Sequence, residues 1–397
     1  MSDPAPDAVE PDSSAPKRRA RVRRRHTVGK VLLASIVVMA MVTGLGTIWL
    51  YRHLNGNLNV LDVTSQLENR PDKVQVQGPQ EPLNVLVMGS DSRDCAGCNI
   101  DNLTGGGQRS DTTILLHLSA DRKRAYGISI PRDLIVDRPD CKAEDGSTIP
   151  GGQGAMWNEA FGLGGPACTI QQFEQLTGIR LDHFVVVNFE GFQGMVDAIG
   201  GVEVCIPEPI VDPAHGINIE AGTRKIKGKE ALNYVRERYV VGNGSDIGRM
   251  KRQQAFIASM AHQVVTAGTL ARPDHLVRFL DSATKSLTVD KGLENVVKIA
   301  QLGIQFKDIG LDNIQFITIP NIPDPSDPNR LVWKQPQAKQ VWDKIAHDEP
   351  LTKQLSEDVI SAGNLPGSGS PSSSGNGGKG NSNEADRQAL EDAGLCT

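Results

Sequence analysis

Charged side chains are absent from Val31–Tyr51, an apolar run near the start of the 397-residue chain. The run is about as long as the roughly 20 residues that a helix needs to cross a hydrocarbon core about 30 Å thick. A cleavable signal peptide is the alternative, but its apolar core is typically about 7–15 residues long. No small-x-small cleavage site follows the run cleanly. We therefore predict an uncleaved transmembrane helix over residues 31–51.

Acidic residues are few before this run, where residues 1–30 carry eight basic and four acidic side chains, a local net charge of +4. Subtracting this from the net charge of −5 for the whole chain leaves −9 for the rest. Because cytoplasmic flanks of membrane helices are rich in lysine and arginine, we predict a single-pass protein of the cell membrane. Residues 1–30 would form a cytoplasmic basic tail and residues 52–397 would lie outside. Nucleic-acid binding by the basic cluster is the weaker alternative.

Cysteine is missing from the predicted cytoplasmic part, and all six cysteines fall on the outer side, where disulfides persist. They are Cys95, Cys98, Cys141, Cys168, Cys205 and Cys396. Six cysteines allow 15 pairings, and the sequence does not choose among them. No second CxxC and no HxxxH follows Cys95-Ala-Gly-Cys98, so structural disulfides are favoured over a redox pair or a zinc site.

Polar segments flank the region that we expect to fold. Residues 52–82 resemble an extracytoplasmic connector, residues 83–350 a catalytic domain, and residues 351–397 a low-complexity tail. Gly, Ser, Asn and Pro dominate residues 363–386, a composition that buries too little apolar surface to offset the entropy of ordering. We expect the tail to be disordered there, and residues 387–397 allow one short helix.

Strand-like and helix-like apolar patterns alternate within residues 83–350. The predicted strands are 84–88, 113–118, 124–130, 184–189 and 202–206, and the predicted helices are 169–177, 192–199, 228–234 and 247–265. Thr169 is the expected N-cap of the first helix, and Ser245 or Asp246 that of the last. The short link 119–123 should make its flanking strands antiparallel neighbours. We predict an α/β fold, a three-layer α-β-α sandwich around a mixed central sheet, preceded by one transmembrane helix.

Charged residues stand at the ends of the first three strands. Asp91 follows the first strand, Asp111 precedes the second, and Arg132 follows the third. If neighbouring strands are antiparallel, all three side chains reach one edge of the sheet. Two carboxylates suit a divalent metal, and a guanidinium matches phosphate oxygens. Taken singly, each residue has a plainer interpretation as a turn cap or a solvated charge.

A second charged cluster follows in Tyr234-Val-Arg-Glu-Arg238 and in the helix that begins near Asp246. Residues three and four apart share a helix face, so Asp246, Arg249 and Gln253 can address one ligand. A solvated polar face is the alternative interpretation.

Seven blocks of the sequence together resemble the signature of the LytR-CpsA-Psr family. They are Asn84–Arg93, Arg109–Thr112, Ser129–Asp133, Asn158–Gly165, Asp182–Asp197, Gly200–Val204 and Ala231–Gln254. The resemblance implies a phosphotransferase that moves a glycopolymer, with one phosphate, from a polyprenyl pyrophosphate carrier to a hydroxyl of peptidoglycan. It also implies contact with membrane lipid and a Mg²⁺ or Mn²⁺ cofactor.

The resemblance further implies roles for single residues. Asp91, Asp111 and Asp246 would hold the metal, Arg109, Arg132, Arg236 and Arg238 would hold the pyrophosphate, and Arg249 and Gln253 would complete the site. Two departures stand out. The family's frequent Lys-Leu-Asn is Met156-Trp157-Asn158 here. The family's frequent second C-terminal domain is not expected, because the low-complexity tail leaves only a short end. The paired cysteines resemble actinobacterial members, which favours arabinogalactan, teichoic-type or other secondary wall polymers.

No GxSxG elbow and no Ser-His-Asp order occurs, so we expect transfer without a covalent nucleophile. A sugar hydroxyl would attack the polymer-side phosphorus, with Asp91 as a candidate general base. An apolar slot for the lipid is predicted from Val185, Val187, Phe189, Phe192 and Val196, which core packing explains equally well. A pyrophosphatase, a non-catalytic wall-binding protein and a regulator remain alternatives.

Helix geometry constrains Arg236 and Arg238. Residues i and i+2 point about 200° apart in a helix but to the same side in an extended segment. If both arginines bind one anion, the helix begun at Gly228 should end near Tyr234 or Val235. Glu237 should then point away from the substrate. Lysine in place of either arginine should weaken the site, because the bidentate fork is lost.

Overall fold

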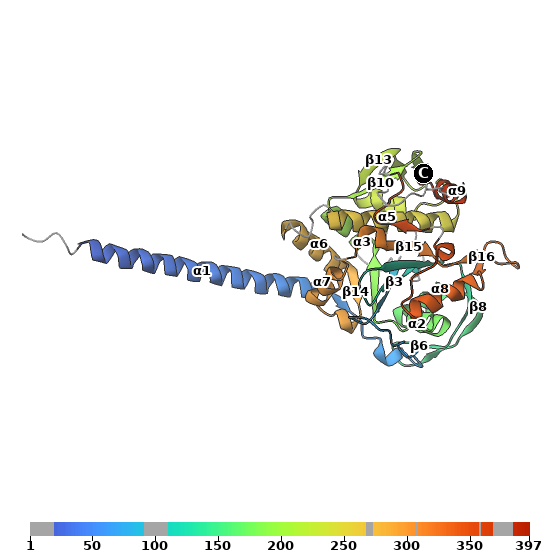
Figure 1. Ribbon diagram of the computed structural model, residues 1–397, viewed down its shortest axis with the longest axis horizontal. Helices are drawn as coiled ribbons and strands as arrows, with labels where there is room; N and C mark the ends of the chain where they lie inside the picture. Colours follow the sequence, from blue (N-terminus) through green and yellow to red (C-terminus); the bar gives the residue numbers. More distant parts are fainter. Residues whose placement is uncertain (1–19, 91–109, 267–272, 307–308, 357–358, 368–383) are drawn as a thin grey trace, which may run out of the picture. The chain divides into compact units, whose positions relative to one another are not determined.

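The computed structural model describes residues 20–90, 110–266, 273–306, 309–356, 359–367 and 384–397. The chain divides into two units, residues 1–53 and residues 54–397. The described part of the first unit consists of residues 20–53 of the helix α1 (Ala20–Asn57), whose last four residues belong to the second unit (Figure 1). Its segment Thr27–Asn57, with mean hydropathy 2.3, is the one described helix long and apolar enough to cross a membrane. It contains the predicted span 31–51.

The second unit is built on a mixed eight-stranded sheet in the order β1-β14-β9-β2-β3-β4-β15-β18. Its strands are β1 (Asn59–Val60), β14 (Leu287–Val289), β9 (His183–Asn188), β2 (Leu83–Ser90), β3 (Ser110–Leu118), β4 (Ala125–Ile130), β15 (Ile314–Thr318) and β18 (Ile360–Ser361). β3 is antiparallel to β4, as the short link predicted, and β2 is also antiparallel to β3. β2 is parallel to β9, and β4 is parallel to β15.

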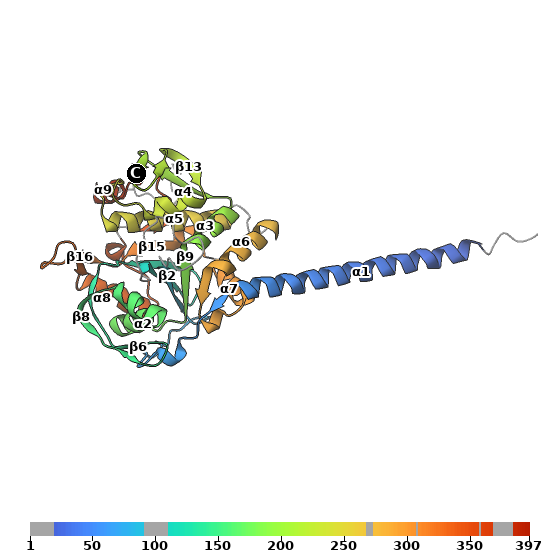
Figure 2. The ribbon, with the colours of Figure 1, turned by 180° about the vertical axis from the view of Figure 1, so that it is seen from behind.

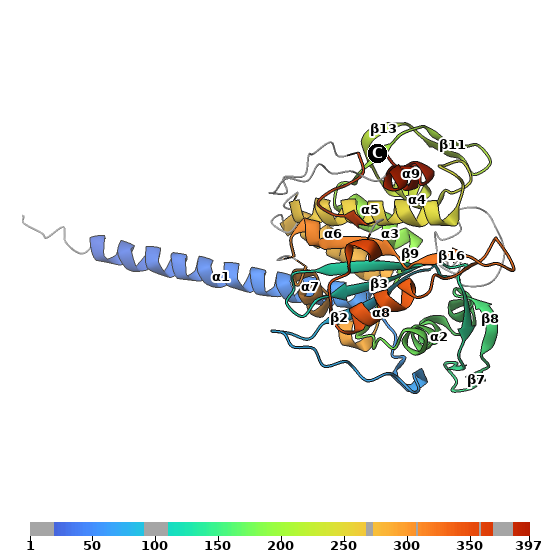
Figure 3. The same ribbon diagram turned by 45° about the vertical axis from the view of Figure 1, so that its right-hand side comes forward.

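Helices cover both faces of this sheet, so the three-layer prediction is confirmed (Figures 1 and 3). The helices of the second unit are α2 (Glu159–Thr177), α3 (Phe189–Ala198), α4 (Gly228–Arg236), α5 (Asp246–Thr266), α6 (Pro273–Ser286), α7 (Val296–Ile304), α8 (Gln337–Ala346) and α9 (Glu384–Asp392). α2 and α8 pack on one face, where Phe173 and Trp342 join Leu86 and Ile128 in the core. α5 lies on the other face, where Ala258 packs with strand residues.

Small two-stranded sheets surround the central one. They are β5 (Ile135–Arg138) with β8 (Gly152–Met156), β6 (Cys141–Lys142) with β7 (Thr148–Ile149), β10 (Val202–Ile206) with β13 (Gly222–Ile226), β11 (Ile210–Asp212) with β12 (Ile217–Ile219), and β16 (Asn321–Pro323) with β17 (Leu331–Trp333). β10 to β13 pack with α3 and α4 in a second apolar cluster (Figure 2). This cluster includes Val235 and so holds the end of α4, which leads into the site described below.

Helix starts differ most from the sequence prediction. α2 begins at Glu159, before the predicted residue 169, and bends at Gly164 and Gly165, which have non-helical dihedral angles. The Thr169 hydroxyl donates to the Gly165 carbonyl, so Thr169 lies inside the helix and is not its N-cap. For α5, the Ser245 hydroxyl accepts the Gly248 N–H, which identifies Ser245 as the cap.

The folded unit includes residues that we assigned to the connector and to the tail. β1 lies at one edge of the main sheet, and Arg70 forms a salt bridge with Glu174 on α2. β18 lies at the opposite edge, and α9 contacts α5. Pairing by strands of two residues depends on tertiary contacts, so composition does not reveal it. Residues 368–383, within the predicted disordered stretch, lie outside the described residues.

Among the described residues of the second unit, two disulfides connect distant segments, Cys141–Cys168 and Cys205–Cys396. The second joins residues 191 positions apart and holds the C-terminal residues against β10. Cys95 and Cys98 lie outside the described residues. The prediction of structural disulfides is confirmed for the other four cysteines.

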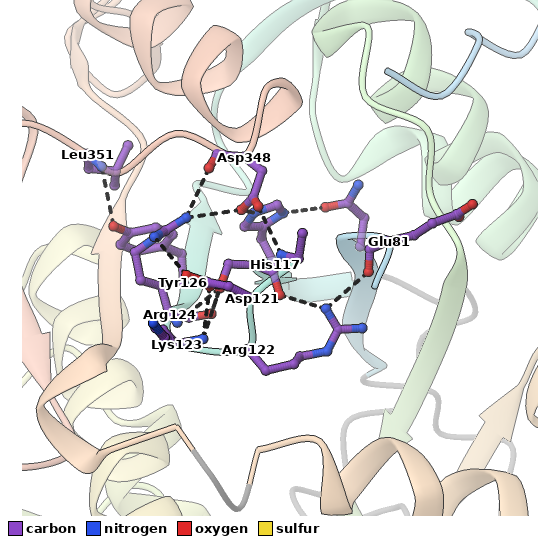
Figure 4. A network of polar contacts seen from close by, with 12 residues as sticks. Glu81, His117, Asp121, Arg122, Lys123, Arg124, Tyr126, Asp348 and Leu351 are labelled. Atoms are coloured by element: carbon purple, nitrogen blue, oxygen red, sulfur yellow. Dashed lines mark hydrogen bonds and ion pairs between the residues drawn. The ribbon is translucent and has the colours of Figure 1, made fainter. Parts of the chain in front are cut away.

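A buried polar network holds the chain after α8 (Figure 4). Asp348 Oδ1 lies 3.2 Å from His117 Nε2, and Asp348 Oδ2 accepts the Ala120 N–H at 2.9 Å. The Asp348 carbonyl also accepts from Arg124 Nη2 at 3.0 Å. Burial tends to raise the pKa of Asp348, but the hydrogen bonds from His117 and Ala120 outweigh it and the pKa is lowered.

Replacing Asp348 by asparagine should therefore destabilise the domain by about 1–3 kcal/mol at neutral pH. Asparagine tolerates the left-handed conformation of this residue, φ 55°, so backbone strain does not contribute. The carboxylate stabilises the fold above the pKa of an unfolded aspartate, about 3.9, and this contribution is lost as the pH falls through the lower folded value. Denaturant unfolding at several pH values measures it. The difference in free energy of unfolding between the variant and the unaltered protein should disappear below about pH 4. The exposed control Asp343→Asn should show no such difference at any pH. A difference that does not depend on pH would contradict this account.

Candidate functional site

The first half of the site is formed where β3 and β4 meet. Ser90 pairs with Ser110 and Thr113 pairs with Ile130, so the end of β2, the start of β3 and the end of β4 share one edge. Asp111 is the second residue of β3, and Arg132 follows β4. Arg132 Nη1 donates to Asp111 Oδ1 at 2.9 Å. The predicted convergence of these two residues is observed, while Asp91 and Arg109 lie outside the described residues.

The second half comes from the start of α5. Asp246 Oδ1 lies 2.5 Å from Arg249 Nη2, 3.4 Å from Arg132 Nη2 and 3.7 Å from Arg238 Nη1. Arg132 thus contacts both Asp111 and Asp246 through different nitrogens. The side chains are largely buried, with 13% of Asp246 and 6% of Arg249 exposed. The two sequence clusters therefore form one site.

The end of α4 supplies two more arginines. The helix ends at Arg236, one or two residues later than predicted, and Glu237 has extended dihedral angles. Arg238 therefore lies beyond the helix, and both guanidinium-bearing residues line the same cavity. Glu237 is buried, and its Oε1 accepts the Arg238 and Tyr239 N–H groups at 2.8 and 2.7 Å. Glu237 also lines the cavity, and the direction of its side chain relative to the substrate stays a prediction.

Four arginines and two aspartates give the site a formal charge of +2. They are Arg132, Arg236, Arg238 and Arg249 with Asp111 and Asp246. Burial tends to raise the pKa of Asp111, but Arg132 and Arg249 outweigh it, so the pKa lies below its usual value. Burial likewise tends to lower the pKa of Arg132, but Asp246 and Asp111 outweigh it and raise the pKa. The charged forms favour one another, and the excess positive charge suits a bound anion.

An apolar cavity of about 520 Å³ opens beside these charges. Arg132, Arg236, Arg238 and Arg249 line it, together with apolar residues of β3, α3 and α5. Of the five residues predicted for a lipid slot, Val187, Phe189 and Phe192 line the cavity. Val185 does not line the cavity. Val196 is fully buried in the second apolar cluster, in agreement with the alternative interpretation of core packing. The cavity thus joins a positively charged subsite, suited to an anion, to an apolar one.

Gln253 makes two hydrogen bonds that the sequence did not predict. Its Oε1 accepts the Thr112 hydroxyl at 3.2 Å, and its Nε2 donates to the Val235 carbonyl at 3.0 Å. These bonds tie α5 to β3 and to the end of α4. Gln253 lines the cavity, but its amide already serves to position the neighbouring elements.

Sequence reasoning missed the residues that orient the arginines. The Arg236 guanidinium lies 4.6 Å from the Phe189 ring centre, and that of Arg238 lies 4.6 Å from the Tyr239 ring centre. Arg252 is 1% exposed and donates to the Ala393 carbonyl at 2.8 Å and to the Glu237 carbonyl. Its position within the Ala231–Gln254 block was a signal, but its partner near the C-terminus is not predictable from local pattern.

Comparison with known proteins finds similarity to one family and to proteins named for cell-wall synthesis. The sequence model of the LytR_cpsA_psr family matches residues 50–347. The probable cell wall biosynthesis protein LcpB of Corynebacterium glutamicum is 28% identical over 352 residues, covering 86% of this chain and 77% of that protein. The polyisoprenyl-teichoic acid–peptidoglycan teichoic acid transferase TagU of Enterococcus faecalis is 28% identical over 274 residues, covering 68% of this chain and 83% of that protein.

Solved structures share the fold. A LytR-Csp2A-Psr enzyme from Actinomyces oris matches with a TM-score of 0.51 at 21% sequence identity, over 70% of this chain and 97% of that one.

Proposed function

Because this chain belongs to the LytR_cpsA_psr family, we propose that it transfers a phosphate-linked glycopolymer from a polyprenyl pyrophosphate carrier to a hydroxyl of peptidoglycan. Relatives named as a cell wall biosynthesis protein and a teichoic acid transferase support a cell-wall substrate. The observation that carries the proposal is the cavity in which four arginines adjoin an apolar wall. A lipid pyrophosphate has this same division between a doubly anionic head and an apolar tail.

The arginines would bind the pyrophosphate head. Guanidinium groups pair with phosphate oxygens as forks, and low exposure strengthens such contacts. Arg132 and Arg249 are held by Asp246, while Arg236 and Arg238 rest on aromatic rings. These supports fix each guanidinium before substrate binds, which reduces the entropy lost on binding. Val187, Phe189 and Phe192 would contact the first isoprene units.

A Mg²⁺ or Mn²⁺ ion fits the acidic residues of the site. Within the described residues, both Asp246 oxygens are buried, and Oδ2 has no hydrogen-bond partner, while Oδ1 lies within ion-pair distance of three arginines. Asp111 contacts the same Arg132 side chain, and carboxylate oxygens are the ligands that Mg²⁺ prefers. Asp111 and Asp246 would hold the ion, together with Asp91, and the ion would neutralise charge on the phosphates. Its presence remains a proposal.

The transfer proposed for these residues forms one bond and breaks one. The hydroxyl oxygen of peptidoglycan attacks the polymer-side phosphorus, and the bond from that phosphorus to the bridging oxygen breaks. Polyprenyl phosphate leaves with the bridging oxygen, and the hydroxyl proton passes to a base, for which Asp91 is the candidate. The arginines stabilise the charge that moves toward the leaving phosphate.

The proposed orientation places the site outside the membrane, as the lysine and arginine excess before Val31 indicates. A reporter that is active only outside the cytoplasm should work when fused after Thr397 and fail when fused before Met1. A cytoplasmic reporter should give the reverse pattern. Cytoplasmic activity of the C-terminal fusion would contradict an extracytoplasmic transferase.

Reconstitution with and without acceptor tests the proposed function. Full-length protein in detergent would be incubated with a lipid-linked polymer labelled in its sugars. We expect label to enter insoluble peptidoglycan, and little to be released when peptidoglycan is withheld. Equal release without acceptor would favour the pyrophosphatase alternative, which uses the same arginines but passes the phosphate to water. Binding to peptidoglycan without turnover would favour a wall-binding protein.

A further inference from the structure

A second group of possible metal ligands lies at the rim of the cavity. Within the described part of the chain, Asp212, His215 and Glu237 bring ligand atoms within 4.8 Å of one another. Asp212 ends β11, and His215 lies in the turn between β11 and β12. Glu237 caps α4. Two segments distant in sequence thus meet, outside the group formed by Asp111 and Asp246.

Backbone amides hold both carboxylates in place. Asp212 Oδ1 accepts the Ala214 N–H at 3.0 Å, which leaves Oδ2 to face His215 Nδ1 at 2.5 Å. Glu237 Oε1 accepts the N–H groups of Arg238 and Tyr239, and Oε2 makes neither bond. One oxygen of each group is therefore fixed by the backbone. Hydrogen bonds of this kind orient the ligands of known metal sites.

The electrostatics of the group also favour a cation. Asp212 is 6% exposed and Glu237 is 5% exposed, and they adjoin the apolar cluster that contains Ile210 and Ile217. Buried carboxylates require a cation or a dense set of hydrogen bonds. Among the described residues, the ion-pair partner of Asp212 is His215. Glu237 forms no salt bridge with a lysine or arginine there, although buried Arg252 lies near enough to attract its charge. A bound divalent ion would compensate both charges at once.

We propose that Asp212, His215 and Glu237 bind a divalent transition-metal ion of the Zn²⁺ class. One imidazole and two carboxylates suit Zn²⁺ or Mn²⁺ and leave positions for water. With metal–ligand bonds of about 2.0–2.2 Å, ligand atoms lie roughly 3–3.5 Å apart. His215 Nδ1 must therefore give up its hydrogen bond to Asp212 Oδ2, now 2.5 Å away, and separate from it on binding, while ligand atoms farther apart than this draw together. The His215 side chain is 47% exposed and can move to do so.

The ion would join the β11–β12 turn to the loop that carries the arginines. Glu237 stands between Arg236 and Arg238, and both Glu237 and His215 line the substrate cavity. Because Glu237 accepts hydrogen bonds from the backbone N–H groups of Arg238 and Tyr239, an ion bound to Glu237 would also hold these two residues in place. The site is independent of the proposed reaction, because it requires no pyrophosphate and no peptidoglycan.

Calorimetric titration of the full-length, chelator-treated protein in detergent with Zn²⁺ alone tests the site. We expect one ion per chain at this site, with binding weakened about 100-fold in His215→Ala and in Glu237→Gln, at the upper end of losses seen when metal-site partners are removed. His347→Ala, which alters another exposed histidine, and Asp111→Asn should leave that binding within twofold. Titration with Mn²⁺ shows which ion class is preferred.

Co²⁺ absorption supplies a second measurement on the same variants. The visible bands of bound Co²⁺ should change when His215 is removed, because a nitrogen ligand is lost. If Glu237→Gln does not fold, His215→Ala decides, since its side chain is half exposed and its thermal unfolding is expected to be unchanged. Unchanged Zn²⁺ affinity in His215→Ala, or loss of binding in Asp111→Asn, would overturn the assignment.

Discussion

Asp111→Asn is expected to lower the rate of polymer transfer by about 10²–10³-fold, the loss typical when one group that stabilises transition-state charge is removed. Asp111 is ionised at neutral pH because Arg132 and Arg249 lower its pKa. Asparagine keeps an oxygen of the same shape but removes the negative charge that holds Arg132 and the proposed metal. Initial rates measured against Mg²⁺ concentration should show both a lower maximum and a higher requirement for the ion.

Two controls separate this effect from unfolding. Asp145→Asn changes an exposed aspartate in the turn between β6 and β7 and should leave the rate within twofold. The Asp111→Asn variant should also retain a single cooperative unfolding transition, since its side chain is 31% exposed. A near-normal rate with a normal response to Mg²⁺ would remove Asp111 from the metal site.

Arg132→Lys is expected to reduce transfer by about 100-fold although the charge is retained. The guanidinium uses Nη1 for Asp111 and Nη2 for Asp246. A single ammonium group does not span both carboxylates and also offer a fork to phosphate. The loss should appear in kcat/KM for the lipid-linked donor, measured at saturating Mg²⁺.

Arg278→Lys provides the matched control for this substitution. Arg278 pairs with Asp274 on the exposed surface of α6, where both side chains are 65% exposed. Its replacement should change neither the rate nor the stability measurably. If Arg132→Lys also leaves kcat/KM for the lipid-linked donor unchanged, Arg132 does not bind the pyrophosphate.

The central strands were predictable because their signals are local. Runs such as Thr113–Leu118 are apolar and bounded by turn residues, and the short link after Leu118 determines the antiparallel pairing. The edge strands β1 and β18 have two residues each, and their pairing depends on the sheet that they join. The same holds for Cys205–Cys396, whose cysteines are brought together by tertiary structure.

The site was predictable to the extent that strand ends determine it. Antiparallel pairing places Asp111 and Arg132 at one edge whatever the rest of the fold. Helix periodicity placed Arg249 on the Asp246 face of α5 but did not reveal that Gln253 bonds to Thr112 and Val235. The helix α4 ends at Arg236, later than predicted, and the next residue, Glu237, accepts the Arg238 N–H through its side chain. This contact depends on buried surroundings, so the local sequence pattern did not predict it.

The fate of the polymer-side phosphate tests the central claim most directly. A donor carrying ³²P in the phosphate next to the polymer and ¹⁴C in the polyprenyl chain would be incubated with full-length protein and peptidoglycan. Attack on the polymer-side phosphorus predicts that ³²P becomes bound to peptidoglycan in a ratio of one to the transferred polymer, while ¹⁴C leaves as polyprenyl monophosphate without ³²P. Recovery of ³²P with the lipid, or as soluble polymer phosphate whether or not peptidoglycan is present, would contradict the proposed transfer.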